Sequence, residues 1–199
     1  MIGIIDYGAG NLFSVKNALD HLGFANSITR DEDEIRSADK LILPGVGAFP
    51  DAMRLLRDLG LDRVICEEAE KKPLLGICLG MQMLFEKSFE FEETKGLSLI
   101  PGEVRAIEAP GLKIPNIGWS ELFLQNSCPL SQGIQEGDMV YYVHSYKAVT
   151  ENKYISLYSE YGGVVPGLVF RDRIFGTQFH PEKSGKVGLR MLKNFGEMK

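Results

Sequence analysis

Residues 74–85 read LLGICLGMQMLF. The apolar run that opens this stretch is the pattern of a buried strand, and the apolar spacing that follows is typical of a helix. Gly76, Cys78 and Gly80 stand at the junction as Gly-x-Cys-x-Gly, the cysteine counterpart of the Gly-x-Ser-x-Gly nucleophile elbow. A strand that turns directly into a helix strains the corner residue and points its side chain into open space. The stretch therefore predicts a nucleophile, Cys78, between a strand and a helix.

Cys78 has two interpretations at this point. A helix N-terminus behind the side chain favours a thiolate, and the free backbone N–H groups, that of Leu79 first, can hold a developing oxyanion. A lone cysteine is nevertheless more often a small buried hydrophobic residue. The pentapeptide alone leaves catalysis and core packing equally open, so the rest of the chain has to decide.

The composition is that of one globular domain. The 199 residues suit a single domain, 1–199, and the net charge of −5 argues against a nucleic-acid partner. No apolar run approaches the roughly 20 residues that a membrane-spanning helix needs, so no membrane association is expected. Residues 1–6 are too short for a signal peptide and lack its basic start, and they indicate a first strand instead.

The cysteines and glycines indicate a cytoplasmic protein without metal or cofactor. Cys66, Cys78 and Cys128 are an odd, scattered set, which is neither a disulfide framework nor a zinc pattern, and a reducing cytoplasm fits them best. Three histidines in the whole chain make a histidine-rich metal site unexpected. Gly8-x-Gly10 resembles the start of a dinucleotide fingerprint, but Phe13 stands where its third glycine belongs.

The first half of the chain alternates strands with helices. Apolar strands are expected at 2–5, 40–43 and 74–78, and helices at 11–22, 31–38, 50–59 and 62–71. This alternation predicts a mostly parallel sheet with right-handed crossovers. The loop Pro44–Phe49 follows the carboxyl end of a strand, where open α/β sheets bind ligands, although taken alone an ordinary connection is the simpler interpretation.

The second half changes in character after Lys87. Short strands punctuated by glycine and proline are expected at 103–108, 139–149, 153–159 and 168–177, and an amphipathic helix at 185–198. A single sheet extended by antiparallel strands accounts for them without a second domain. The expected fold class is α/β: one domain with a mostly parallel central sheet, flanking helices and antiparallel strands added in the C-terminal half.

A base and its orienting group stand together near the C-terminus. Residues 173–182 read RIFGTQFHPE, and side chains at i and i+2 of an extended segment point the same way. Pro181 disfavours the helical region for His180, so His180 and Glu182 should share a face. This pair lacks only a nucleophile, which Cys78 would supply if the two strands lie together.

These blocks together resemble a known family. Gly76–Gln82 and Gln178–Ser184 are similar to the class I (triad) glutamine amidotransferases, and the resemblance covers nearly the whole chain. Further blocks are similar to one branch of that family, the glutaminase subunits of imidazole glycerol phosphate synthase: Asp6–Asn11, Pro44–Phe49, Lys95–Leu99, Gly118–Trp119 and Val143–Tyr146.

The resemblance implies a reaction and a set of site residues. Cys78 would attack the side-chain amide of glutamine and form a thioester, His180 would move the protons, and Glu182 would orient His180. Glutamate and ammonia would be the products. The oxyanion donors implied are Leu79 with Val46 or Gly47, and the residues that hold glutamine are Gln82, Ser145 and Tyr146. Without the family, Ser145 and Tyr146 would be taken as a plain strand end.

The resemblance also implies a heterodimer with a (β/α)8-barrel cyclase. The cyclase would use the ammonia to make imidazole glycerol phosphate and AICAR in histidine biosynthesis. Trp119, the only tryptophan, suits an interface anchor, although core packing is equally open. The branch usually carries His in place of Asn116 and Asn in place of Ser120, which leaves the details of the interface open. The surface expected to face the partner includes Asn11, Tyr141, Asn116, Ile117, Gly118 and Trp119.

Other functions remain open beside this one. A stand-alone cysteine hydrolase would use the same elbow without a partner, and a glutaminase for another pathway, such as sugar modification, would serve a different acceptor. A regulatory protein without activity would normally have lost a triad residue, and all three are present.

Overall fold

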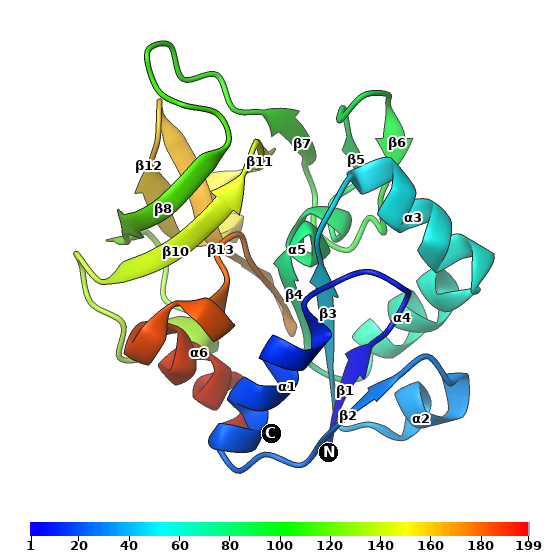
Figure 1. Cartoon of the computed structure of the whole chain (residues 1–199). Coiled ribbons are helices and arrows are strands. Elements are labelled where there is room, and N and C mark those ends of the chain that lie inside the picture. The colour runs from blue at the N-terminus through cyan, green and yellow to red at the C-terminus, as the bar shows by residue number, and fades with distance from the viewer. Residues whose placement is uncertain (199) are drawn as a thin grey trace.

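The strands expected in the first half form the parallel part of an eight-stranded central sheet (Figure 1). The computed structural model describes residues 1–198. The parallel strands, in order across the sheet, are β2 (Asn26–Thr29), β1 (Ile2–Ile5), β3 (Lys40–Gly45), β4 (Leu74–Cys78) and β14 (Ile174–Thr177). The sheet continues antiparallel with β13 (Val164–Arg171), β12 (Ile155–Glu160) and β9 (Phe123–Leu124). The predicted mixed sheet is confirmed.

β2 lies outside the strands expected from the sequence. It reads NSIT, its first three residues are half-buried, and it forms one edge of the sheet. A strand in that position needs no continuous apolar run, which is the signal that marks the strands buried on both faces.

Helices cover both faces of the sheet. α1 and α6 pack on one face, with their apolar side chains against Ile4, Ile42 and Ile77, whereas α3 and α4 pack on the other, against Ile5 and Leu43. Among residues 1–198, none of the helices combines the length and the apolar character that crossing a bilayer takes. The helices are α1 (Leu12–His21), α2 (Glu32–Ser37), α3 (Phe49–Asp58), α4 (Leu61–Ala69), α5 (Leu79–Met83) and α6 (Gly185–Glu197), with short 3-10 turns at Pro129–Ser131, Asn152–Tyr154 and Pro181–Lys183.

Two small sheets stand beside the central one, so the expectation that all later strands extend a single sheet is wrong. β10 (Met139–His144) pairs with β8 (Asn116–Glu121). β11 (Tyr146–Val149) belongs to a four-stranded sheet with β7 (Glu103–Ala106), β5 (Lys87–Ser88) and β6 (Thr94–Lys95). The predicted continuous strand 139–149 is therefore broken at Ser145, because its two halves pair with different partners.

The elbow between β4 and α5 is packed backbone against backbone. A Cβ atom on Gly80 would lie 1.8 Å from the carbonyl oxygen of Leu43 in β3, and a Cβ on Gly76 would lie 2.6 Å from the carbonyl oxygen of Gly80. Neither contact can be relieved by turning a side chain. Glycine is required at both positions because the first turn of α5 lies directly on the neighbouring strand.

Gly80→Ala is expected to destabilise the fold by about 3 kcal/mol or more, because backbone must move to admit the methyl group. Gly3→Ala is the matched control: its closest contacts, with Cβ of Ala38 and Cδ2 of Leu41, would be 3.2 Å, so a shift of a few tenths of an ångström relieves them. Urea unfolding of both variants measures the difference. Equal losses in the two variants would contradict the proposed backbone contact at the elbow.

Candidate active site

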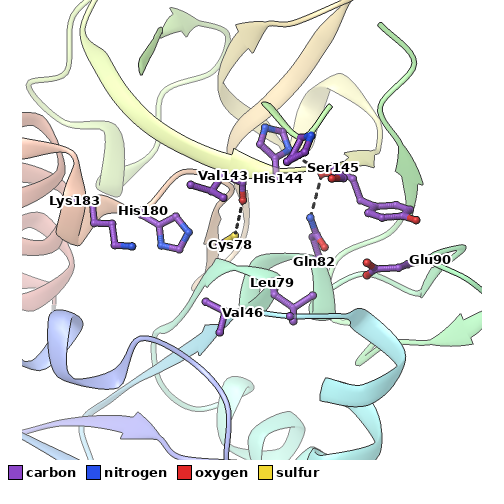
Figure 2. A pocket seen from close by; sticks show the side chains of 13 residues that line it. Val46, Cys78, Leu79, Gln82, Glu90, Val143, His144, Ser145, His180 and Lys183 are labelled. Carbon is purple, nitrogen blue, oxygen red and sulfur yellow. Dashed lines mark hydrogen bonds between the residues drawn. The ribbon is translucent and has the colours of Figure 1, made fainter. Parts of the chain in front are cut away.

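A cavity of about 350 Å³ opens at the carboxyl ends of β3 and β4. Its walls come from the loop after β3, the start of α5, the chain around Ser145 and the turn after β14 (Figure 2). Ligand sites of open α/β sheets lie at this edge. All three predicted groups of residues (the nucleophile with its base, the oxyanion donors and the glutamine contacts) have members that line this cavity.

Cys78 occupies the strained corner that the sequence predicts. It ends β4 and precedes α5 with φ 55° and ψ −110°, a left-handed backbone conformation that non-glycine residues rarely adopt. Strain of this kind costs on the order of 1–3 kcal/mol and persists where the surrounding structure enforces it. The side chain is largely buried, yet it opens on the cavity, so the alternative of plain core packing does not describe it.

Two polar groups flank the sulfur of Cys78. Its Sγ lies 3.8 Å from the carbonyl oxygen of Val143 and 3.8 Å from Nε2 of Gln178. The carbonyl can accept from the thiol, whereas the amide can donate to the sulfur. Gln178 is fully buried two residues before His180, and the sequence block that contains both residues is the signal that could have identified it.

His180 and Glu182 form the expected pair, but by a different local route. His180 Nδ1 lies 2.9 Å from Glu182 Oε1, and both side chains are buried. His180 itself is extended, whereas Pro181–Lys183 form a 3-10 turn, so the prediction of a shared strand face is wrong for Glu182. The pairing of β14 with β4 places the turn beside Cys78.

The electrostatics of His180 favour its charged form. Burial alone lowers the pKa of His180, but hydrogen bonds and negative charge from Cys78 and Glu182 raise it overall to about 9. The imidazolium is therefore the main form at neutral pH. A protonated imidazole beside the sulfur can stabilise a thiolate and can later give its proton to a leaving group.

The predicted oxyanion donors line the same cavity. Leu79 is the first residue of α5, so its backbone N–H has no acceptor within the helix. Val46 and Gly47 follow β3; Val46 is half-exposed, and Gly47 has φ 95°. Figure 2 shows Val46 and Leu79 on the same side of Cys78.

Gln82, Ser145 and Tyr146 meet on the other side of the cavity. Nε2 of Gln82 donates to the carbonyl oxygen of Tyr146 at 3.1 Å and to Oε1 of Gln178 at 3.0 Å. Ser145 is the break between β10 and β11, which brings it to the cavity wall. The interpretation of Ser145 and Tyr146 as a plain strand end is therefore incomplete.

Three polar side chains that the sequence analysis did not assign to the site also line the cavity: Glu90, His144 and Lys183. Glu90 is buried, and its Oε2 accepts a hydrogen bond from the backbone N–H of Phe49 at 2.8 Å. Burial raises the pKa of Glu90, and the hydrogen bond from Phe49 offsets only part of that rise. The sequence reads as a polar loop there and gives no signal of a buried carboxylate. Among residues 1–198 there is no cluster of three His, Cys, Asp or Glu side chains that could hold a metal ion.

Most residues expected at the partner surface lie on or beside the β8–β10 pair, but Asn116 points inward. Ile117 and Trp119 are 60% and 53% exposed, so Trp119 is not a core residue. Trp119 packs edge-on against Tyr141, with ring centroids 5.9 Å apart. The side chain of Asn116 is buried, with Nδ2 3.2 Å from His144 Nε2, and it therefore contributes nothing to this exposed surface.

NMR titration of the histidines is expected to give a midpoint near pH 9 for His180 and near pH 4 for His144, whose pKa is lowered mainly by burial. Glu182→Gln should lower the His180 midpoint by about one pH unit or more, because a neutral amide no longer stabilises the imidazolium. A wild-type His180 midpoint below pH 7 would contradict the charge arrangement described above.

The same titration has a consequence for stability. The pKa of His180 is higher in the folded protein, about 9, than its ordinary value of 6.5, so protonation stabilises the fold below pH 6.5. That stabilisation is lost as the pH rises from 6.5 through 9. Urea unfolding across this range should show a smaller loss in Glu182→Gln than in the wild type.

Comparison with known proteins places the chain in a family. The family model described as Glutamine amidotransferase class-I matches residues 3–198. The chain is 54% identical over 196 residues to the imidazole glycerol phosphate synthase subunit HisH of Bacillus cereus (strain AH187), which covers 98% of this chain and 93% of that protein. The subunits of the same name from Bacillus anthracis (strain A0248) and Bacillus thuringiensis (strain Al Hakam) are 53% and 52% identical, with the same coverage.

Solved structures share the fold. A glutamine amidotransferase structure matches with a TM-score of 0.76 at 20% identity over 98% of each chain. The structure of PurLQS from Thermotoga maritima contains a chain that matches with a TM-score of 0.76 at 20% identity, over 98% of this chain and 96% of that chain. At this identity the likeness concerns the fold alone. The chain belongs to the class-I glutamine amidotransferases, and within them to the group of imidazole glycerol phosphate synthase HisH subunits.

Proposed function

We propose that this protein is the glutaminase subunit of an imidazole glycerol phosphate synthase. It hydrolyses glutamine to glutamate and ammonia and passes the ammonia to a cyclase, which makes imidazole glycerol phosphate and AICAR in histidine biosynthesis. The observation that carries the proposal is the placement of strained Cys78 beside the His180–Glu182 pair, in one cavity with the Gln82 amide. The names of the relatives support the choice of pathway.

The first half of the reaction forms a thioester. The Cys78 thiolate attacks the side-chain carbonyl carbon of glutamine, and the C=O electron pair moves to oxygen, which gives a tetrahedral oxyanion. As the C–N bond breaks, the His180 imidazolium gives its proton to the leaving nitrogen, and ammonia departs. Glu182 keeps Nδ1 of His180 engaged at 2.9 Å, so that Nε2 faces the reaction.

The second half releases glutamate. The now neutral His180 takes a proton from water, the hydroxide attacks the thioester carbon, and collapse of the second oxyanion expels the Cys78 thiolate. Backbone N–H groups of Leu79 and of Val46 or Gly47 stabilise both oxyanions, each donor being worth about 3 kcal/mol of the barrier. These roles use groups that border the same cavity.

Recognition of glutamine falls to the polar wall opposite. Both hydrogens on Nε2 of Gln82 are used within the protein, which leaves its Oε1 to accept from a ligand. Figure 2 shows the Glu90 carboxylate pointing toward the Gln82 side chain, and both residues line the cavity. We assign the α-ammonium group of glutamine to the space between them, and its α-carboxylate to the segment Ser145–Tyr146.

The partner surface follows from the exposed apolar side chains near the cavity. Ile117 and Trp119 on β8, with Tyr141 opposite Trp119 on β10, form a face to which a cyclase can bind. We assign Gly118 and the Asn11 loop to the same interface. Ammonia released into water would be protonated and would cease to be a nucleophile, so the two sites must be sealed against each other. Both proteins would then work in the cytoplasm as a heterodimer.

Glutamate release from glutamine is expected to require Cys78 and to rise when a (β/α)8-barrel cyclase and its nucleotide ligand are added. Cys78→Ala should lose about three orders of magnitude or more, because it removes the nucleophile. Cys66→Ala is the matched control, since Cys66 is a half-buried free cysteine that does not line the cavity. Activity retained in Cys78→Ala would remove the nucleophile assignment, and full activity without any partner would indicate a stand-alone hydrolase.

Trp119→Ala is expected to weaken cyclase binding about tenfold or more, because a half-exposed aromatic side chain at an interface is a typical hot spot. Thermal stability should change little. Leu59→Ala is the control: Leu59 is 44% exposed but follows the end of α3 that points away from the cavity. Unchanged affinity in a calorimetric titration of Trp119→Ala would move the interface elsewhere.

A further inference from the structure

His144 is a buried histidine on the cavity wall that the proposed reaction does not use. It ends β10, is 6% exposed, and both of its ring nitrogens have partners. Nδ1 lies 2.8 Å from the carbonyl oxygen of Tyr146, and Nε2 lies 3.2 Å from Nδ2 of Asn116. Asn116 stands directly opposite His144 in the β8–β10 pair.

The two partners determine the tautomer of His144. A backbone carbonyl can only accept, so Nδ1 must carry the hydrogen, which leaves Nε2 as an acceptor. The Asn116 amide then donates Nδ2–H to Nε2. Burial, the largest cause, lowers the pKa of His144 to about 4, so the ring is neutral at working pH. A neutral ring with both nitrogens engaged has no capacity left for proton transfer.

The carbonyl that His144 holds is shared with the glutamine site. The Tyr146 oxygen accepts from His144 Nδ1 at 2.8 Å and from Gln82 Nε2 at 3.1 Å. Gln82 Nε2 also donates to Gln178 Oε1 at 3.0 Å, and Nε2 of Gln178 lies 3.8 Å from the Cys78 sulfur. Each side-chain amide in this series of hydrogen bonds can therefore have only one orientation. The oxygen of Gln82 is left facing the cavity, and the nitrogen of Gln178 faces the sulfur.

We propose that His144, fixed by Asn116, is a positioning residue for glutamine recognition. It holds the Tyr146 carbonyl in place and thereby aligns the Gln82 amide oxygen with the α-ammonium group of the substrate. The inference rests on the proposed glutaminase function. A donor at the position of Nδ1 is what the role requires, because only that atom reaches the shared carbonyl.

The test separates the two ring positions. His144→Asn places an N–H donor near the position of Nδ1, whereas His144→Gln places a polar atom near that of Nε2. The substrates are glutamine and glutaramate, which is glutamine without its α-amino group. The readout is the ratio of kcat/KM for glutamine to kcat/KM for glutaramate, measured as glutamate or glutarate release in the presence of the cyclase.

His144→Gln is expected to lower this ratio about tenfold or more, chiefly through a higher KM for glutamine, because one hydrogen bond that aligns Gln82 is lost. His144→Asn should keep the ratio within about threefold of the wild type. Ser156→Ala, which removes a buried hydroxyl donor that does not line the cavity, should lower Tm and leave the ratio unchanged. If His144 had a purely structural role, His144→Gln would also lower Tm and leave the ratio unchanged, and that result would overturn the proposal.

Asn116→Ala and the activity of the wild type itself separate failure of this inference from failure of the proposed function. Asn116→Ala removes only the hydrogen bond to Nε2 that holds the ring in place, and it is expected to lower the ratio by a smaller factor than His144→Gln. It decides the matter if His144→Gln fails to fold, and an unchanged ratio would then overturn the proposal. If the wild type releases no glutamate, the proposed function fails. If the wild type is active and His144→Gln keeps its preference for glutamine, the inference alone fails.

Discussion

The backbone of Gly80 lies directly against the carbonyl of Leu43, and this contact sets the geometry of everything around the cavity. It holds the first turn of α5 on the end of β3, so the loop that leaves β3 passes beside the residue that begins the helix. Cys78 is left at the corner with φ 55°, and the Val46–Gly47 segment borders the same space. A side chain at Gly80 would separate the helix from the strand and move Cys78, the proposed nucleophile, away from the groups assigned to its oxyanion.

The second half of the site reaches this corner through strand pairing. β14 lies beside β4 in parallel register, Thr177 opposite Ile77, and the chain that leaves it carries His180 to the sulfur. Glu182 joins through a tight 3-10 turn and holds the imidazole by one short hydrogen bond. The proposed nucleophile and base thus follow neighbouring strands of one sheet, which limits the conformational entropy that would be lost in bringing them together.

The elbow and the His180–Glu182 pair could be predicted from the sequence because their physical requirements are local in the chain. Glycine is required at positions 76 and 80 because a side chain there would collide with neighbouring backbone. The alternation of strands and helices determines the parallel part of the sheet. The sequence could not show that residues 139–149 divide at Ser145, since both halves are equally apolar and only their distant partners β8 and β7 separate them. Glu90 and the inward direction of Asn116 were invisible for the same reason: their burial is decided by segments far away in the chain.

Trp119 gives the molecule an optical signal of its own. It is the only tryptophan in the sequence, its indole is 53% exposed, and it packs edge-on against Tyr141. Intrinsic emission excited at the red edge of the absorption band therefore arises from one place on the surface, three residues along β8 from Asn116, whose side chain lies on the opposite, inward face of the strand. A partner that covers this face and excludes water must shift that emission to the blue, so association can be followed in real time with the unlabelled protein.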